Sequence, residues 1–150
     1  MMNKVSCRAF HGVLLCALAL SLASCKSSGA KNVPPTQSGS PEVTLAPRPV
    51  KEIQAITREF FVGRGYVERG SEHAYEQVFD KPTKSGRATK ALRVRLRLVR
   101  QTNGSWRFVG RPMGVEAWRS DLESEVDVPN GAGQIQGFLE EIKNRIESNR

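Results

Sequence analysis

Cysteine is missing from most of this chain. Three cysteines occur, at Cys7, Cys16 and Cys25, and none follows in the remaining sequence. The segment after Cys25 therefore cannot form an internal disulfide, a thiolate nucleophile or a cysteine-based metal site. Packing and polar contacts alone have to stabilise whatever fold it adopts.

The chain also lacks the motifs of common enzyme classes. It contains no HExxH, GxSxG or phosphate-loop pattern, and His73 is the only histidine in the segment that follows the last cysteine. The stretch HAYEQVFD, residues 73–80, predicts a strand in which His73 points away from Glu72 and Glu76. An acidic run over residues 121–127 lacks the central glycine and terminal glutamate of an EF-hand loop. We expect no catalytic residue, no metal and no cofactor.

No hydrophobic run is long enough to cross a membrane. The uncharged stretch from Gly12 to Ser24 is shorter than the roughly 20 apolar residues that a spanning helix needs. It follows a start that carries Lys4 and Arg8 and no acid. A basic start, a short apolar core and small residues after it are typical of a secretory signal peptide.

The apolar stretch ends in Leu22-Ala23-Ser24-Cys25. This order resembles the lipobox of bacterial lipoprotein precursors, in which an aliphatic residue and two small residues precede a cysteine. The resemblance implies a signal peptide over residues 1–24, and a cysteine that carries a diacylglyceryl group and an acylated amine after cleavage. More than one acyl chain gives stable membrane anchoring. The alternative is an ordinary cleaved signal that leaves Cys25 as a free thiol.

The residue after Cys25 is Lys26 rather than aspartate. In Gram-negative lipoproteins an aspartate there retains the protein in the inner membrane, so the resemblance implies the periplasmic side of the outer membrane. Residues 26–49 are rich in Ser, Pro and Gly and contain no aromatic residue. Such a segment cannot bury enough apolar surface to offset its chain entropy. We therefore expect a disordered linker over residues 25–50 and a folded domain over residues 51–150.

Both ends of that domain have helical periodicity. Ile53, Ile56 and Phe60 lie on one face of a helix, which Gly63 or Gly65 can end. A second apolar stripe predicts a C-terminal helix and consists of Ile135, Phe138, Leu139, Ile142 and Ile146. Between the helices the period changes to two, which predicts an antiparallel meander of three to four strands. The fold class that follows is α+β, with the C-terminal helix packed on the sheet.

The clearest strand is LRVRLRLVR, and a turn with Asn-Gly separates it from SWRFVGR. A loop over residues 102–104 places Leu98 opposite Phe108 and keeps the apolar side chains of both strands on one face. A two-residue loop would instead place Val99 opposite Phe108 and mix the two faces. The longer loop needs a positive φ at its third position, which Gly104 provides. We predict the three-residue loop.

Acids are absent from residues 81–115, in a chain whose net charge is +8. Strand alternation places Arg93, Arg95 and Arg97 on one face, about 6.5–7 Å apart, and the predicted register sets Arg111 opposite Arg95. Like charges in this arrangement repel each other. The pattern therefore predicts a counter-ion, an acidic neighbour or fraying at this place.

Two interpretations of these four arginines follow. They are the solvent side of an ordinary strand and pair with Glu76 or Glu116, or they form an anion site for lipid headgroups, lipopolysaccharide or cell-wall polymers. No aromatic residue is interleaved with them, which disfavours nucleic acid. We expect a non-catalytic domain that contacts another envelope component, with a protein as the first candidate partner. An anion-binding module is the alternative.

Overall fold

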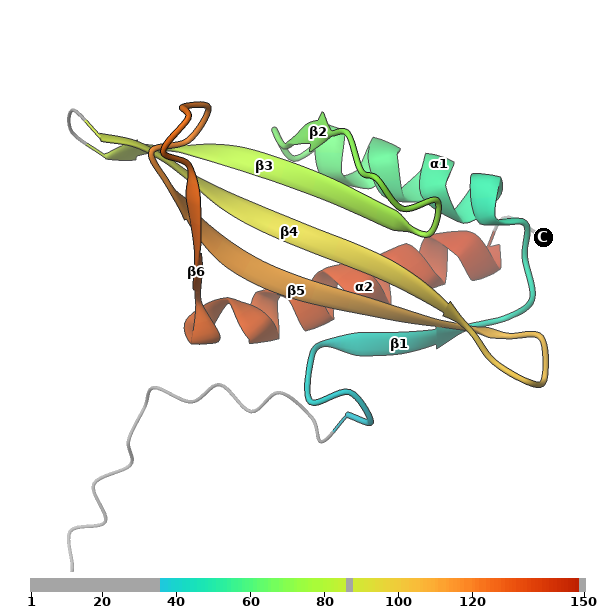
Figure 1. Cartoon of the computed structure of the whole chain (residues 1–150). Coiled ribbons are helices and arrows are strands. Elements are labelled where there is room, and N and C mark those ends of the chain that lie inside the picture. Colours follow the sequence, from blue (N-terminus) through green and yellow to red (C-terminus); the bar gives the residue numbers. More distant parts are fainter. Residues whose placement is uncertain (1–35, 86–87, 149–150) are drawn as a thin grey trace, which may run out of the picture.

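The computed structural model of the protein describes residues 36–85 and 88–148. They form an α+β fold in which six antiparallel strands build one sheet and two helices pack against one of its faces (Figure 1). The predicted fold class and the packing of the C-terminal helix on the sheet are confirmed, while the predicted number of strands is too low. The signal peptide, Cys25 and residues 26–35 of the predicted linker lie outside the described residues.

The sheet consists of β1 (Glu42–Leu45), β2 (Val67–Arg69), β3 (Glu76–Ser85), β4 (Ala88–Arg100), β5 (Trp106–Glu116) and β6 (Ser124–Asp127). Its order is β1-β5-β4-β3-β2, and β6 also pairs with β5. The strands β2 to β5 therefore form the predicted meander. The outer edge of β5 is shared, because β1 pairs with its first part and β6 with its last part.

Strand β1 corrects the predicted linker. It pairs with β5 from Glu42 opposite Val109 to Leu45 opposite Trp106, and the Leu45 side chain is fully buried. Four residues are too few for an alternating pattern to stand out in a sequence rich in Pro and Ser. The boundary predicted at residue 50 is therefore wrong, because the folded domain includes β1.

The helices are α1 (Val50–Val62) and α2 (Ala132–Ser148), and a short 3₁₀ turn (Pro129–Gly131) precedes α2. Gly63 follows α1 with a right-handed φ of −61°. The left-handed conformation that reverses the chain after the helix belongs to Gly65, whose φ is 78°. Of the two glycines that the sequence offers for this role, the structure selects the second.

Both apolar stripes of the helices pack against the same face of the sheet. The core contains Ile53, Phe60, Phe61, Phe79, Val94, Leu96, Leu98, Phe108, Ile135, Leu139, Ile142 and Ile146. The rings of Phe61 and Phe79 stack with their centroids 4.7 Å apart. Gly110 lies where the sheet and α2 approach closely, since a Cβ there would come within 2.5 Å of the Ile135 side chain. The two helices and this face of the sheet therefore share one apolar core.

The β4–β5 hairpin has the predicted register. Leu98 lies opposite Phe108, and Gln101 and Ser105 close a loop of three residues between them. Gly104 occupies the third loop position with a φ of 84°. Because Leu98 and Phe108 both belong to the core, burial fixes this register, and Arg93, Arg95 and Arg97 of β4 lie on the opposite face.

Candidate functional site

The open face, as we call the side of the sheet opposite the helices, contains all four arginines of the predicted anion site. Arg93, Arg95 and Arg97 project from β4, and Arg111 lies opposite Arg95 on β5. Their surroundings differ, however, because Arg93 is buried while Arg97 and Arg111 are exposed. The structure therefore divides the predicted site into a closed end and an accessible end.

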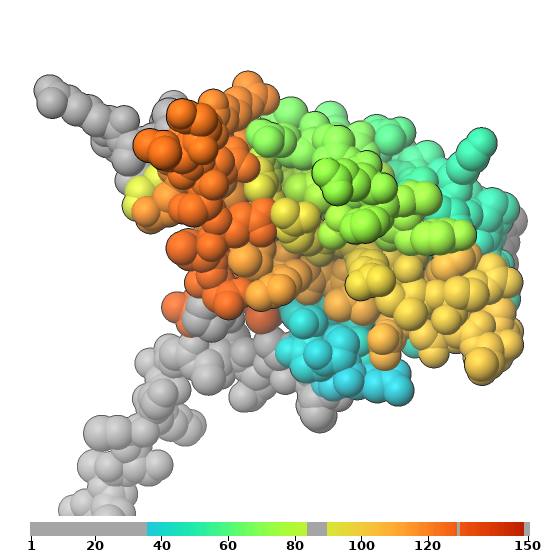
Figure 2. Space-filling model, viewed as in Figure 1, coloured from blue at the N-terminus to red at the C-terminus, as the bar shows by residue number. Residues whose placement is uncertain are grey.

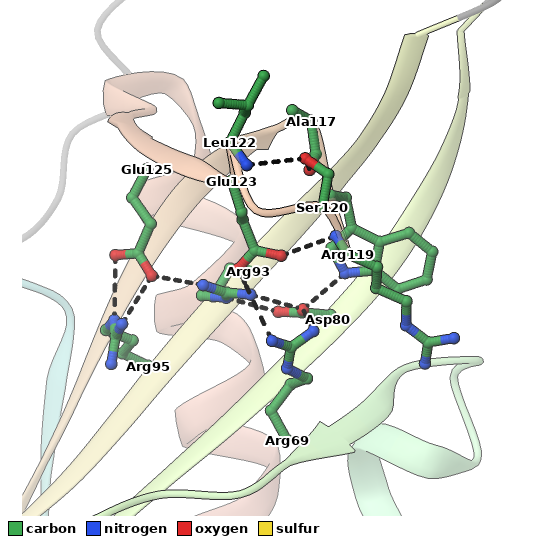
Figure 3. Close-up of polar contacts among 11 residues, drawn as sticks. Arg69, Asp80, Arg93, Arg95, Ala117, Arg119, Ser120, Leu122, Glu123 and Glu125 are labelled. Atoms are coloured by element: carbon green, nitrogen blue, oxygen red, sulfur yellow. Dashed lines mark hydrogen bonds and ion pairs between the residues drawn. The ribbon is translucent and has the colours of Figure 1, made fainter.

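Arg93 has carboxylate partners on three sides (Figure 3). Its Nε and Nη2 donate to the two carboxylate oxygens of Asp80 at 2.7 and 2.8 Å. Nη2 also donates to Glu123 at 2.7 Å, and Nη1 donates to Glu125 at 2.6 Å. With an exposed fraction of only 6%, this guanidinium cannot bind an external anion without losing internal partners. Arg93 is therefore not available as a binding residue of the predicted anion site.

Asp80 lies on β3 directly opposite Arg93 and is fully buried. Its Oδ2 accepts a further hydrogen bond from Nε1 of Trp118 at 2.8 Å and lies 3.7 Å from Nη1 of Arg69. A buried carboxylate is costly unless cations and donors surround it. The contacts of Asp80 meet that requirement, so a structural role explains this charged residue.

The loop between β5 and β6, residues 117–123, turns back over the open face (Figure 3). Ala117 and Arg119 have positive φ values of 49° and 63°, which are uncommon for residues with a side chain. The backbone N–H of Arg119 donates to Glu123 at 2.8 Å, and this bond, followed by that from Arg93, lowers the pKa of the Glu123 carboxyl. Contacts with the charged cluster thus hold the loop in a conformation that its residues rarely adopt.

Arg95 is held by Glu125 of β6. Its Nη2 and Nε donate to the two carboxylate oxygens at 2.6 and 3.2 Å, and its Nη1 lies 3.7 Å from Glu76. The prediction that the arginines pair with Glu76 is therefore confirmed for Arg95. The other predicted partner, Glu116, instead pairs with Lys90 at 2.8 Å. Of the three outcomes predicted for crowded arginines, an acidic neighbour is the one observed.

The pKa shifts of this cluster arise mainly from hydrogen bonds between its own members. Hydrogen bonding to Asp80 is the main cause that raises the pKa of Arg93. Burial on its own raises the pKa of Asp80, but hydrogen bonds from Arg93 and Trp118 outweigh it, so that pKa lies below its usual range. The pKa of Glu125 is lowered mainly by its hydrogen bonds with Arg95. All members of the cluster stay ionised at neutral pH.

Sequence reasoning does not identify the acidic partners of Arg93. A signal for two of them is present, because Glu123 and Glu125 are spaced two residues apart and so match the spacing of Arg93 and Arg95 on one face of a strand. Asp80 gives no such signal, since only the β3–β4 register brings it opposite Arg93. The cluster depends on pairing between distant segments.

The accessible end of the open face lies beyond Arg95. A hollow of about 330 Å³ there is lined by Arg95, Arg97, Arg107 and Arg111, with Val99 and Val109 between them. Figure 2 shows the molecule from this side, with the segment around residues 117–127 (orange) over one end of the sheet. The four arginines come from two neighbouring strands and line one hollow together with Glu76. This is the part of the predicted anion site that an external group can reach.

His73 does not lie in a strand, because β3 starts at Glu76 and His73 is exposed in the preceding turn. It lines a second hollow of about 550 Å³ with Tyr75 and Arg97. Among the described residues, no group of His, Cys, Asp and Glu is arranged to hold a metal ion. In the same part of the chain no helix is long and apolar enough to cross a membrane.

No protein-family model, no curated protein and no solved structure matches this chain.

Proposed function

We propose that the protein is a lipid-anchored, non-catalytic binding module of the bacterial cell envelope and that the open face is its contact surface. The lipobox-like Leu22-Ala23-Ser24-Cys25 supports the anchor on Cys25, and Lys26 supports the periplasmic side of the outer membrane.

The choice of the open face as the contact surface depends on one observation. Both helices pack against one face of the sheet, while the accessible end of the open face presents Arg97, Arg107 and Arg111 around Val99 and Val109. Ligand sites combine a concave, partly apolar surface with a few polar groups that fix the orientation of the ligand. A protein partner and an anionic polymer both fit such a surface. Arg97, for which the described residues provide no ion pair, favours the anionic component.

Site-specific photo-crosslinking in the native bacterium tests this proposal. A photoreactive residue at Val109 lies on the open face, and one at Lys51 lies exposed on α1, on the helical side. We expect envelope adducts from the first position and none from the second. Equal adducts from both positions, or none from Val109, would contradict the proposed contact surface.

The anchor is tested in the same cells. Cys25→Ala should abolish palmitate incorporation, move the chain out of the membrane fraction and remove the adducts formed at Val109. Continued palmitate labelling of the Cys25→Ala variant would contradict lipidation at this residue. An unlabelled wild-type chain would favour the ordinary cleaved signal.

A further inference from the structure

We infer that the open face binds the open face of a second copy of this chain, and that Leu122 of each copy enters a hollow of the other. The inference deepens the proposed function and rests on it, because it names the partner of the same surface. It depends on a raised apolar residue at one end of the open face and a partly apolar hollow at the other end.

The raised residue, Leu122, lies near the tip of the β5–β6 loop. With 77% of its surface exposed, it is the most exposed large hydrophobic residue in the described part of the chain. Figure 3 shows its side chain pointing away from the charged cluster, and the neighbouring Asp121 is exposed as well. The loop therefore presents one apolar side chain next to one carboxylate.

A single exposed leucine needs no explanation by itself. Here, however, the loop that carries it is fixed in an uncommon conformation, with positive φ values at Ala117 and Arg119. The hydrogen bond from Arg93 to Glu123 and that from Trp118 to the cluster hold it against the sheet. A contact residue that is already ordered costs less entropy when it binds. The loop is thus suited to enter a hollow without further folding.

The matching hollow, of about 330 Å³, lies at the accessible end of the open face. Val99 and Val109 line it between the arginines, so it offers apolar surface to a side chain that enters. We call it the valine hollow. A leucine in contact with the two valines is removed from water, which is the main driving force of most protein association.

The charges around the valine hollow favour a single carboxylate over a polyanion. Glu76 lies opposite Arg97 in the β3–β4 register and lines the hollow with it. Arg111 donates to Asp127 at 2.9 Å, in a pair whose side chains are 60% and 73% exposed. A row of anions would meet Glu76 and Asp127, whereas the one carboxylate of Asp121 can approach Arg97 or Arg111 beside the entering leucine.

A two-fold axis makes the open face complementary to itself. In a symmetric pair both copies present the same surface, so the contact between Leu122 and the valine hollow forms twice. Arg93 and Arg95 already have carboxylate partners on their own chain, which limits the repulsion between two facing sheets. One kind of contact therefore fills the hollow and covers the exposed leucine of both copies.

Pairing of two copies through a sheet edge is less suitable. Strand β2 pairs with β3 only as far as Asp80, so the edge of β3 is free from Lys81 on. That free part begins with Lys81 and Pro82, and lysine and proline are residues that keep natural sheet edges from pairing. The open face is the better surface for a second copy.

The pair should be weak in dilute solution and should form on a membrane. Two buried leucines offer little against the translational and rotational freedom that association removes. Copies that share one membrane through the proposed lipid on Cys25 are confined near each other, which raises their effective concentration. The experiments therefore use the full, anchored chain.

Disulfide formation between two single-cysteine variants tests the contact in phosphatidylcholine liposomes that carry the lipidated chain. A mixture of Leu122→Cys and Val109→Cys, oxidised with copper phenanthroline, should give a linked dimer, because a disulfide forms only between residues in close contact. A mixture of Leu122→Cys and Lys51→Cys should not, since Lys51 lies on α1. Either open-face variant alone should form little dimer, because the two-fold axis keeps like positions apart.

Photo-crosslinking from Val109 in the native bacterium gives a second readout. An adduct of two copies of the chain should form, and Leu122→Ser should reduce it about tenfold, as expected for the loss of one buried leucine. The matched control, Val62→Ser, replaces a 51% exposed apolar residue of α1 and should leave the adduct unchanged. Both variants should unfold at the temperature of the wild type, which separates lost pairing from lost folding.

Three results would overturn the inference. They are the absence of the mixed disulfide, equal disulfide yields in the two mixtures, and an adduct of two copies that persists in Leu122→Ser. If Val109 gives adducts only with other envelope components, the choice of partner is wrong while the proposed contact surface stands. If Val109 gives no adduct at all, the open face is not the contact surface and both proposals fail.

Discussion

Arg93 and Arg97 come from the same alternating run, yet they have opposite surroundings. Arg93 is buried with carboxylate partners on three sides, and Arg97 is exposed without an ion pair in the described chain. A buried charge needs compensating partners and an exposed one does not. Arg93 therefore contributes to the stability of the domain. The second is available for binding.

Removing the buried arginine should be costly. Arg93→Ala leaves Asp80, Glu123 and Glu125 without their shared cation, and we expect the free energy of unfolding to fall by about 3–5 kcal/mol. Arg93→Lys keeps the charge but loses the planar fork of donors. Its free energy of unfolding should therefore lie between those of the wild type and Arg93→Ala. Urea unfolding followed by circular dichroism measures both changes.

The matched control is Arg111→Ala, which removes an exposed ion pair and should change the unfolding free energy by less than about 1 kcal/mol. If Arg93→Ala is no more destabilising than Arg111→Ala, the cluster does not stabilise the fold.

The same cluster predicts a dependence of stability on pH. Folding lowers the pKa of Asp80, Glu123 and Glu125, so the unfolded chain binds more protons than the folded one in acid. Their contribution is complete above the unfolded pKa values of about 4 and is lost as the pH falls through the lower folded values. Unfolding free energies measured at a series of pH values from neutral into acid should therefore decline below about pH 4.

Glu125→Gln removes one of these titrating groups. Its stability should decline less steeply in acid than that of the wild type, because one fewer proton is taken up on unfolding. Identical slopes for the variant and the wild type would show that Glu125 does not contribute.

At the scale of the elements, the helices and the β4–β5 hairpin could be predicted from sequence, whereas β1 and the β5–β6 loop could not. The stripes of α1 and α2 and the Leu98–Phe108 register depend on burial of many side chains along one element, which local periodicity records. β1 has only four residues, and the β5–β6 loop depends on charges from β3 and β4. Contacts between distant segments leave little local signal.

The contact between α2 and the sheet can be tested at Gly110. A Cβ there would meet Ile135 at 2.5 Å and both Leu96 and Leu139 within 3.4 Å. Gly110→Ala should overpack this contact and lower the unfolding free energy by about 1–3 kcal/mol. Thermal and urea unfolding measure the change.

Gly137→Ala is the matched control for that substitution. Gly137 lies inside α2, where a Cβ would meet no atom within 4 Å, so alanine should stabilise the helix by up to about 1 kcal/mol. A Gly110→Ala variant as stable as Gly137→Ala would mean that the helix does not approach the sheet this closely.

At the scale of the whole molecule, each side of the sheet has a separate role. The helical side holds the apolar core, and on the open side the ion-pair cluster fixes the β5–β6 loop over one end while the hollow lined by Arg97 and Arg111 lies at the other. Because the core and this hollow use opposite faces, exposed side chains of the hollow can be replaced without disturbing the packing of the helices. A tethered domain of this kind is suited to contact another component through one side.

The most direct test of the central claim, that the open face is the contact surface, is the accessibility of single cysteines to a maleimide. The chain has no cysteine after Cys25, so Val109→Cys and Lys51→Cys each introduce one unique site into the folded domain. Labelling rates are compared between the purified protein and intact envelopes. We expect Val109→Cys to be protected in envelopes while Lys51→Cys reacts equally in both. Equal reactivity of Val109→Cys in both preparations would contradict the claim.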